Sequence, residues 1–294
     1  MRRLIVNADD FGLTVGVNRA IVEAHQHGIV TSLTMMASAR AFDDAAKRAR
    51  SLDVRERPLS IGCHVVLVDG MPLCPAEQIP SLIEAEDGVI RFRKNLSSFA
   101  TAALTGRIDA AEIEAEATAQ MRHIQQAGVV PSHFDTHKHT HMFSAILRPL
   151  LRAAKACGIN AVRNPFGPGA GLPFARVAAD FELTKRFAQM RVLRSFAPSF
   201  RREVARCGLR TTDGAVGVEV SGILDLNLFV AIASRIPEGT WELVCHPGYN
   251  DSDLDGVRTR LRASRERELE ILTSPEARRA LERHAVQLIG YNEL

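Results

Sequence analysis

The amino-acid sequence predicts an α/β fold, a single-domain barrel of the (β/α) type that is TIM-like and has room for irregular strands. Short apolar runs alternate with helical patterns along the chain, an order that favours parallel pairing of the strands. Polar residues follow four of these runs, at the end where barrel enzymes carry their active sites. No linker, charge-run boundary or repeat divides the 294 residues, so one domain over 1–294 is expected.

The N-terminal part of the chain begins with a short buried strand over 3–8, RLIVNA. Helical periodicity follows over 14–27 and stops before Gly28, a residue suited to end a helix. The next elements are expected to be a strand, a helix and a strand, over 31–38, 42–51 and 59–66. From 68 to about 106 the chain is expected to be a long irregular stretch, because it contains several prolines.

The middle and C-terminal parts continue the alternation. A strong helical pattern covers 109–127 and is closed by Gly128. The later elements are expected in this order: strand 132–136, helix 143–157, strand 160–163, a Gly/Pro loop over 164–173, helix 224–234, strand 240–245, helix 258–272 and strand 285–289. An open, doubly wound sheet is the alternative, but it needs a glycine-rich phosphate turn after the first strand. That strand leads instead into NADDFG.

Composition excludes several classes of protein. The net charge of +3 is too mild to indicate nucleic-acid binding, and no basic and aromatic RNA-binding pattern is present. Five cysteines without CxxC spacing indicate reduced thiols rather than a disulfide framework. The apolar run near the N-terminus is too short for a signal peptide, and none approaches the roughly 20 residues of a membrane span. We therefore expect a soluble, cytoplasmic protein.

Two adjacent carboxylates, Asp9 and Asp10, follow the first expected strand. Buried carboxylates are costly unless a cation lies nearby. Their side chains diverge, so one can hold a metal ion while the other acts as a base. A helix N-cap or a solvated turn is an equally good interpretation of the pair taken alone.

Single histidines follow two other expected strands. His64 comes after LSIGC, where a hydrogen-bonded structural role is the commoner one for a lone histidine. His246 comes after WELVC and precedes a Pro-Gly bend. A histidine at that point can serve as a general acid or base, and capping of the turn is the alternative.

The segment HFDTHKHTH, residues 133–141, holds four histidines and one aspartate. Every second residue of an extended strand lies on one face, so all five of these side chains would share it. A strand cannot hold so many polar groups against an apolar core, and we therefore expect it to end near His137. Mixed histidine and carboxylate donors suit zinc or another divalent ion. A surface histidine cluster is the alternative.

Four segments together resemble the YdjC-like carbohydrate deacetylases, also called the ChbG/HpnK family: LIVNADDFG at the start, GCHVVLVDGMPL at 62–73, HFDTHKHTHMF at 133–143 and CHPG at 245–248. The match is ordered and spans most of the chain, although 165–215 matches weakly. The segment beginning HVVLVDGMPL is most similar to the hopanoid-biosynthesis subgroup, HpnK. The other subgroup acts on chitooligosaccharides.

The resemblance implies a barrel-like fold and one divalent metal ion, Mg²⁺ or Zn²⁺. By motif position, its ligands would be Asp10, His64 and His137. The general base would be Asp9 and the general acid His246. Within the histidine-rich segment, Asp135 would orient a ligand imidazole, His139 and His141 would lie behind the ligands or face substrate, and His133 would be structural.

The implied reaction is metal-dependent hydrolysis of the N-acetyl group of an amino sugar, on a glycosylated hopanoid lipid if the subgroup holds. Alternatives are a chitooligosaccharide deacetylase and a metal-dependent hydrolase of another ester or amide. A phosphate-ester hydrolase would need cationic clamps, for which Arg163 is the one clear candidate. A non-catalytic metal- or sugar-binding protein would have no use for a spare carboxylate beside the ligands. We expect a homo-oligomer and no nucleic-acid partner.

A lipid substrate would bring the protein to a membrane surface. The segment 185–210 interleaves basic residues with Phe187, Phe196 and Phe200. Basic residues favour anionic lipid by about 1 kcal/mol each, and aromatic residues can enter the interface. A solvated helical face with a few core phenylalanines is the interpretation we favour for this segment, and peripheral membrane contact is the alternative.

Overall fold

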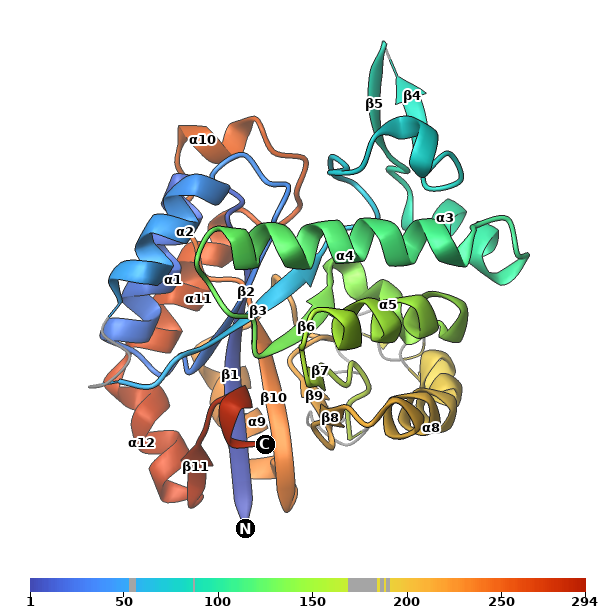
Figure 1. The fold of residues 1–294 in the computed structure, drawn as a ribbon. Coiled ribbons are helices and arrows are strands. Elements are labelled where there is room, and N and C mark those ends of the chain that lie inside the picture. Colours follow the sequence, from blue (N-terminus) through green and yellow to red (C-terminus); the bar gives the residue numbers. More distant parts are fainter. Residues whose placement is uncertain (53–56, 87, 169–183, 186–187, 189–190) are drawn as a thin grey trace.

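Parallel strands lie side by side in one sheet whose spatial order is β8-β7-β6-β3-β2-β1-β10-β9 (Figure 1). The computed structural model describes residues 1–52, 57–86, 88–168, 184–185, 188 and 191–294. The strands of this sheet have the following bounds: β1 Arg2–Phe11, β2 Ser32–Met35, β3 Ser60–Val65, β6 His133–Thr136, β7 Ala161–Val162, β8 Arg210–Thr211, β9 Gly214–Val216, β10 Gly239–Cys245 and β11 Val286–Leu288. The expected fold class, a single-domain α/β barrel, is confirmed.

The two ends of the sheet are joined by one segment of chain. β8 pairs with β7, and β9 pairs with β10, all in parallel. Only Thr212 and Asp213 separate β8 from β9, so the segment 210–216 bridges the two ends and nearly closes the barrel. β11 pairs with the first residues of β1, outside this circuit. A nearly closed parallel sheet directs all its strand C-termini to one rim, where active sites of this architecture lie.

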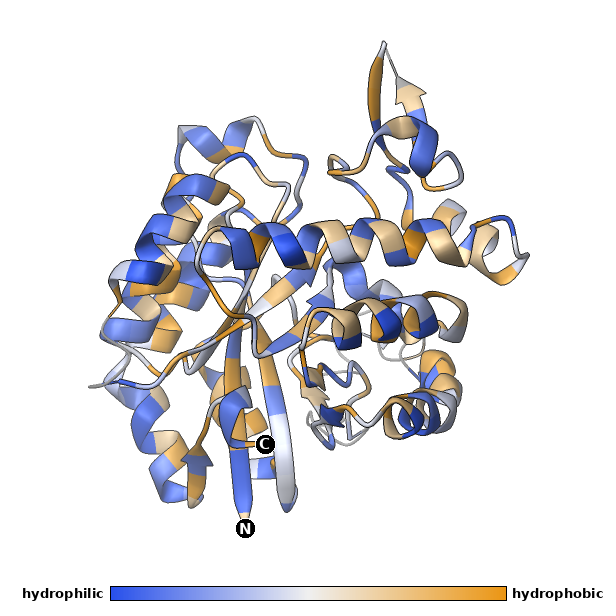
Figure 2. Ribbon diagram, viewed as in Figure 1, coloured by the Kyte–Doolittle hydropathy of each residue, from blue (hydrophilic) through white to orange (hydrophobic). Residues whose placement is uncertain are grey.

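Helices surround the sheet and carry both hydrophilic and hydrophobic residues along their length (Figure 2). Their bounds are α1 Val15–Gln26, α2 Phe42–Ser51, α3 Leu96–Leu104, α4 Ala110–Gln126, α5 Ser144–Ala156, α8 Ala197–Cys207, α9 Leu226–Arg235, α10 Ser252–Asp255, α11 Ala263–Thr273 and α12 Pro275–Arg283. In α4 the buried apolar residues recur at helical spacing: Ile113, Ala117, Met121 and Ile124. This stripe packs the helix on the barrel. Within the described ranges, no helix combines the length and apolarity needed to cross a bilayer.

The stretch from 68 to 106 contains regular elements, so the expectation of one long irregular stretch was wrong. It contains a short 3₁₀ turn, Ala76–Gln78, the antiparallel hairpin of β4 (Ile83–Glu86) and β5 (Val89–Phe92), and α3. This insertion projects beyond the barrel (Figure 1). Its base is anchored by the buried Glu116 carboxylate, which accepts hydrogen bonds from the backbone N–H of Leu73 at 2.9 Å and Cys74 at 2.8 Å. Such tertiary anchoring of short elements leaves no periodic pattern in the sequence.

Other element boundaries also differ from expectation. The last long helix, expected from 258, begins at Ala263 as α11, because the Thr259 hydroxyl accepts the N–H of Leu261 at 3.1 Å and so competes with helical bonding. β1 runs to Phe11, three residues beyond the expected end at 8, and therefore includes both aspartates. Its register against β2 shifts between Ala8 and Phe11.

Candidate metal centre and catalytic site

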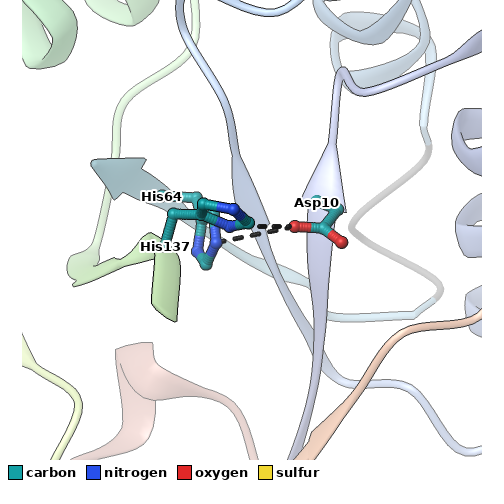
Figure 3. A group of neighbouring side chains, drawn as sticks. All are labelled: Asp10, His64 and His137. Atoms are coloured by element: carbon teal, nitrogen blue, oxygen red, sulfur yellow. Dashed lines mark ion pairs between the residues drawn. The ribbon is translucent and has the colours of Figure 1, made fainter. Parts of the chain in front are cut away.

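Three side chains predicted to hold a metal ion converge at the rim of the barrel. Asp10 lies in β1, His64 in β3, and His137 follows β6 directly (Figure 3). The Asp10 Oδ1 atom lies 3.6 Å from His64 Nε2 and 3.8 Å from His137 Nδ1. One donor atom from each residue falls within 4.8 Å of the others. Donors at this separation can be bridged by one ion with small side-chain adjustments.

The backbone of Asp10 is in the left-handed region, with φ of 71°, at the register shift of β1. A β-bulge re-aims a side chain, and strained backbone of this kind clusters at functional sites. The second carboxylate oxygen, Oδ2, accepts a hydrogen bond of 2.5 Å from the buried Arg265. Burial alone would raise the pKa of Asp10, but the Arg265 guanidinium and the nearby histidines together outweigh it and lower that pKa. The carboxylate is therefore ionised, with Oδ1 directed toward the two histidines (Figure 3).

The imidazole of His64 is oriented from behind by a carboxylate. Its Nδ1 lies 2.8 Å from Asp135 Oδ1, while Nε2 faces Asp10. Burial would lower the pKa of His64, but the carboxylates of Asp135, Asp9 and Asp10 together outweigh burial and raise it to about 9. A carboxylate that holds one ring nitrogen and leaves the other directed at a site is the usual support for a metal-ligating histidine.

His137 begins a tight turn rather than continuing the strand. β6 ends at Thr136, and the next two residues after His137, Lys138 and His139, have left-handed backbone angles, φ of 57° and 53°. The expected end of the strand near His137 is confirmed. Burial lowers the pKa of His137 to about 4, so its ring is neutral and has a free lone pair.

A second cluster of acidic residues, called the interior group below, lies within the barrel around Arg163. The Arg163 guanidinium donates to both oxygens of Asp9 at 2.6 and 2.8 Å, to Glu242 Oε1 at 2.8 Å, and pairs with Asp135. Arg163 is fully buried. Burial would raise the pKa of Asp9, but Arg163 outweighs it and holds that pKa well below its usual range. Asp9 is thus an ionised, rigidly held carboxylate.

The cluster around Asp10 and the cluster around Arg163 differ in how well they could bind a cation. Asp9, His64 and Asp135 also have donor atoms within 4.8 Å of one another. Their two carboxylates, however, already pair with Arg163, whose charge would repel a metal ion. Asp10 shares only one oxygen with a guanidinium and faces two imidazoles. The donor set around Asp10 is therefore the one that fits a divalent metal ion, whose identity the residues leave open.

His246 follows β10 and faces Asp9, with 3.9 Å between its Nε2 and Asp9 Oδ2. Its backbone N–H donates to Glu268 Oε2 at 2.6 Å. Among the described residues its Nδ1 has no hydrogen-bond partner. Glu268 and Arg265 lie one turn apart on α11, so a single helix face contacts both Asp10 and the backbone of His246.

Of the other histidines of the 133–141 segment, His133 and His141 are fully buried, whereas His139 is partly buried. His133 is fully buried and stacks on Tyr291, with 3.6 Å between ring centroids. His141 is held by the Thr136 hydroxyl at 2.7 Å and the Arg163 carbonyl at 3.1 Å. Burial lowers the pKa of His139 to about 3, and its Nδ1 has no partner within the described chain. His133 and His141 thus fill the barrel, whereas His139 keeps a free ring nitrogen.

The sequence predicts few of the supporting residues. It suggests Arg163 only as a phosphate clamp, and it does not indicate a role for Glu242, Arg265, Glu268 or Tyr291. A faint signal existed, because Arg163 directly follows an apolar strand and Glu242 interrupts one. Charged residues at such positions are rarely buried without partners. Nothing along the chain shows which partners they meet.

The basic and aromatic segment 185–210 is only partly described, and Phe187 lies outside the described residues. Phe200 is buried and lies 5.7 Å from Phe166 between ring centroids. Phe196 packs against Phe143 at 5.7 Å. These two aromatic side chains face the protein, as the favoured interpretation of a helical face with core phenylalanines expects.

Comparison with known proteins finds relatives along almost the whole chain. Over 99% of its length the chain is 31% identical to a carbohydrate deacetylase of Brevibacillus brevis, 99% of which is covered, and 31% identical to one of Geobacillus stearothermophilus, 98% of which is covered. A solved structure from Enterococcus faecalis, named for cellobiose-phosphate cleavage, superposes with a TM-score of 0.76 at 26% identity, covering 99% of this chain and 98% of that one. The YdjC-like protein family matches residues 3–283. The chain therefore belongs to the YdjC-like protein family.

Proposed function

We propose that the chain is a metal-dependent carbohydrate deacetylase, which hydrolyses the N-acetyl group of an amino sugar to release acetate and a free amine. The names of its relatives support the reaction class. The observation that carries the proposal is the convergence of Asp10, His64 and His137 beside a separately held carboxylate, Asp9. We further propose that residues 1–294 form one catalytic domain.

One divalent cation, Zn²⁺ or Mg²⁺, would be held by Asp10, His64 and His137. Bound there, it would acidify a water molecule and polarise the acetamide carbonyl. The low pKa of Asp10 supplies an ionised ligand, and the neutral ring of His137 supplies a lone pair. Since a metal ion binds only a deprotonated ring nitrogen, His64 would use Nε2 and keep its Nδ1 proton on Asp135.

Asp9 is the proposed general base, which accepts a proton from the attacking water. Arg163 holds both of its oxygens, so the carboxylate cannot rotate away. Its low pKa keeps Asp9 ionised but limits its proton affinity, and a base of this kind is effective only toward an already acidic proton. A spare, fixed base is what distinguishes this arrangement from a site that only binds metal.

His246 is the proposed general acid, which donates a proton to the amine nitrogen as the C–N bond breaks. Its Nε2 lies 3.9 Å from Asp9 Oδ2, so base and acid face the same space. Glu268 fixes the backbone at His246. Because the two groups must be in opposite protonation states, the rate should show a bell-shaped dependence on pH.

We propose a glycosylated hopanoid lipid as the substrate, on the resemblance of the segment after His64 to the hopanoid subgroup. Chitooligosaccharides are the alternative. Peripheral contact with a membrane, a cytoplasmic location and a homo-oligomeric state belong to the same proposal. A phosphate ester is a poorer candidate, because Arg163 is fully buried and its guanidinium is engaged by three carboxylates.

Acetate release tests the proposal. The purified protein is incubated with acetylated chitobiose and, separately, with an acetylglucosaminyl hopanoid in detergent, each with and without a chelator. We expect acetate from at least one substrate, loss of activity with chelator, and recovery on adding Zn²⁺ or Mg²⁺. Release that chelator leaves unchanged would contradict metal dependence, and metal binding without acetate from either sugar would indicate a binding protein.

The relative rates of acetate release from the hopanoid and from chitobiose distinguish the hopanoid subgroup from the chitooligosaccharide subgroup. A preference for the hopanoid should be accompanied by sedimentation with anionic vesicles at low salt, since peripheral contact through basic residues is electrostatic. A preference for chitobiose without vesicle binding would overturn the lipid assignment and leave the deacetylase assignment standing.

A further inference from the structure

The C-terminal tail inserts into the barrel at the end opposite the candidate site. After β11, the N–H of Ile289 donates to the carbonyl of Leu4 at 3.0 Å, and the N–H of Asn292 donates to the Ser60 hydroxyl at 3.1 Å. Ile289 and Tyr291 form a small buried apolar cluster with Ile5 and Ala161. Both termini lie near the same end of the barrel in Figure 1. The tail residues therefore enter the barrel interior from the end that carries the N-termini of the strands.

Tyr291 is fully buried at the centre of this contact. One face of its ring stacks on His133, with an interplanar angle of 8°. Its hydroxyl donates to Glu242 Oε2 at 2.5 Å. Burial raises the pKa of Tyr291 well above its usual value, so the phenol stays protonated and donates. Stacking fixes the ring, and the hydroxyl then fixes one oxygen of the glutamate.

The other oxygen of Glu242, Oε1, contacts Arg163, which lies between Glu242 and Asp9. Glu242 Oε1 accepts from the Arg163 Nε at 2.8 Å and lies 2.7 Å from Nη2. The same guanidinium holds both oxygens of Asp9. A planar guanidinium that pairs with several carboxylates at once has little freedom of orientation. Glu242, together with Asp135 on the other side, therefore restricts the plane in which Arg163 presents its two outer nitrogens to Asp9.

We propose that Tyr291 is a positioning residue for the deacetylation reaction: through Glu242 it holds Arg163 in the orientation that aligns the Asp9 carboxylate. This inference rests on the proposed role of Asp9 as the base. A ring that served only as packing would need no hydroxyl, and a hydroxyl buried at this depth is costly unless it makes a specific bond. The tail is thus part of the reaction machinery although it lies at the far end of the barrel.

The first test is Tyr291→Phe, which removes one oxygen and keeps the stacked ring. We expect kcat for acetate release to fall about tenfold, the scale of one buried hydrogen bond, with KM and bound metal unchanged. Tyr249→Phe is the matched control, because the other tyrosine of the chain also donates to a glutamate, Glu23, near the surface. The control should leave kcat unchanged.

A double variant tests whether the effect passes through the glutamate. Glu242→Gln keeps the shape of the side chain and removes its charge. If Tyr291 acts through Glu242, Tyr291→Phe combined with Glu242→Gln should be no slower than Glu242→Gln alone. Multiplicative losses would overturn the proposal, as would a Tyr291→Phe variant that melts earlier but turns over substrate at the rate of the Tyr249→Phe control.

A measurement without substrate separates this inference from the proposed function. Hydrogen exchange at the Arg163 Nε–H, followed by NMR of protein with isotope-labelled arginine, should be slow in the wild type and faster in Tyr291→Phe. If the wild type releases no acetate, the function proposal fails, but faster exchange would still support the positioning of Arg163 by Tyr291. Unchanged exchange would overturn the positioning whatever the activity.

Discussion

Asp9 and Asp10 are neighbours in the sequence, and both are buried, with 1% and 3% of their surfaces exposed. Asp9 points into the barrel, where both its oxygens meet Arg163. Asp10 lies at the rim, where one oxygen meets Arg265 and the other faces two imidazoles. Both oxygens of Asp9 are thus engaged by a guanidinium that belongs to the protein. Asp10 retains one oxygen that no guanidinium of the described residues engages.

The difference shows that burial of a charge does not determine its role. Arg163 engages both oxygens of Asp9, so this carboxylate is held rigidly. Arg265 engages only one oxygen of Asp10, and the other oxygen faces the ring nitrogens of His64 and His137. The left-handed backbone at Asp10 separates the two side chains.

Loss of a rim ligand should have the largest effect. His137→Ala should lower metal affinity by more than about 100-fold, beyond the range seen when only a hydrogen-bonded neighbour of a ligand is changed. Metal content after dialysis, measured by mass spectrometry, checks this. His27→Ala, at an exposed position at the end of α1, should keep its metal. Full occupancy in His137→Ala would mean that the ligand assignment is wrong.

Asp9→Asn should abolish most of the activity without removing the metal ion, and so distinguish the interior group from the metal ligands. The amide cannot accept a proton, and loss of a general base typically costs about 10² to 10⁴ in rate. Metal content should remain at the wild-type level, because Asp9 belongs to the interior group. Acetate release and metal analysis on the same sample check both statements. A variant that loses metal along with activity would place Asp9 among the ligands instead.

Arg163→Met should lower the free energy of unfolding of the protein, because it disrupts the interior group. It leaves Asp9, Asp135 and Glu242 buried without their cation, and breaking a buried ion pair from one side typically costs about 3–5 kcal/mol. Urea denaturation measures the loss. Arg152→Met, which removes an exposed pair with Glu114, should lower stability far less because water screens that pair. Equal losses in the two variants would contradict the role given to Arg163.

Asp135 lies between the two groups, and its replacement should have an intermediate effect. Asp135→Asn should weaken metal binding by roughly 10- to 100-fold, since the carboxylate that orients His64 becomes an amide. Competition with a metal-binding dye measures the affinity. Unchanged affinity would indicate that His64 is held by its other neighbours, among them the Thr34 hydroxyl at 3.3 Å.

Acid should destabilise the fold through the buried histidines. Burial lowers the pKa of His133 and His141 well below the usual value, so the unfolded chain takes up protons that the folded one does not. This stability is present above the unfolded pKa, near 6.5, and is lost as pH falls below it, by at most about 1.4 kcal/mol per pH unit for each histidine. Urea midpoints between about pH 7.5 and 5.5 check the slope.

A matched variant identifies the source of that slope. His141→Gln can still hydrogen-bond to Thr136 but no longer titrates, so it should flatten the acid loss. A wild-type midpoint that does not change over the same interval would contradict neutral burial of these histidines.

The amino-acid sequence is enough to predict the barrel class, most of the strands and helices, and the residues that meet at the rim. Alternating apolar runs require parallel strands, and parallel strands in a barrel place their C-terminal ends at one rim. Asp10, His64, His137 and His246 could therefore be predicted as neighbours, because each follows or ends such a run.

The tertiary structure was needed to see which oxygens of the two carboxylates a guanidinium engages. The partners, Arg163 for Asp9 and Arg265 for Asp10, lie more than a hundred residues away along the chain. The insertion around β4 and β5 and the buried tail at Tyr291 were likewise hidden. Local patterns report periodicity and propensity, whereas charge compensation depends on distances between side chains that only folding brings together.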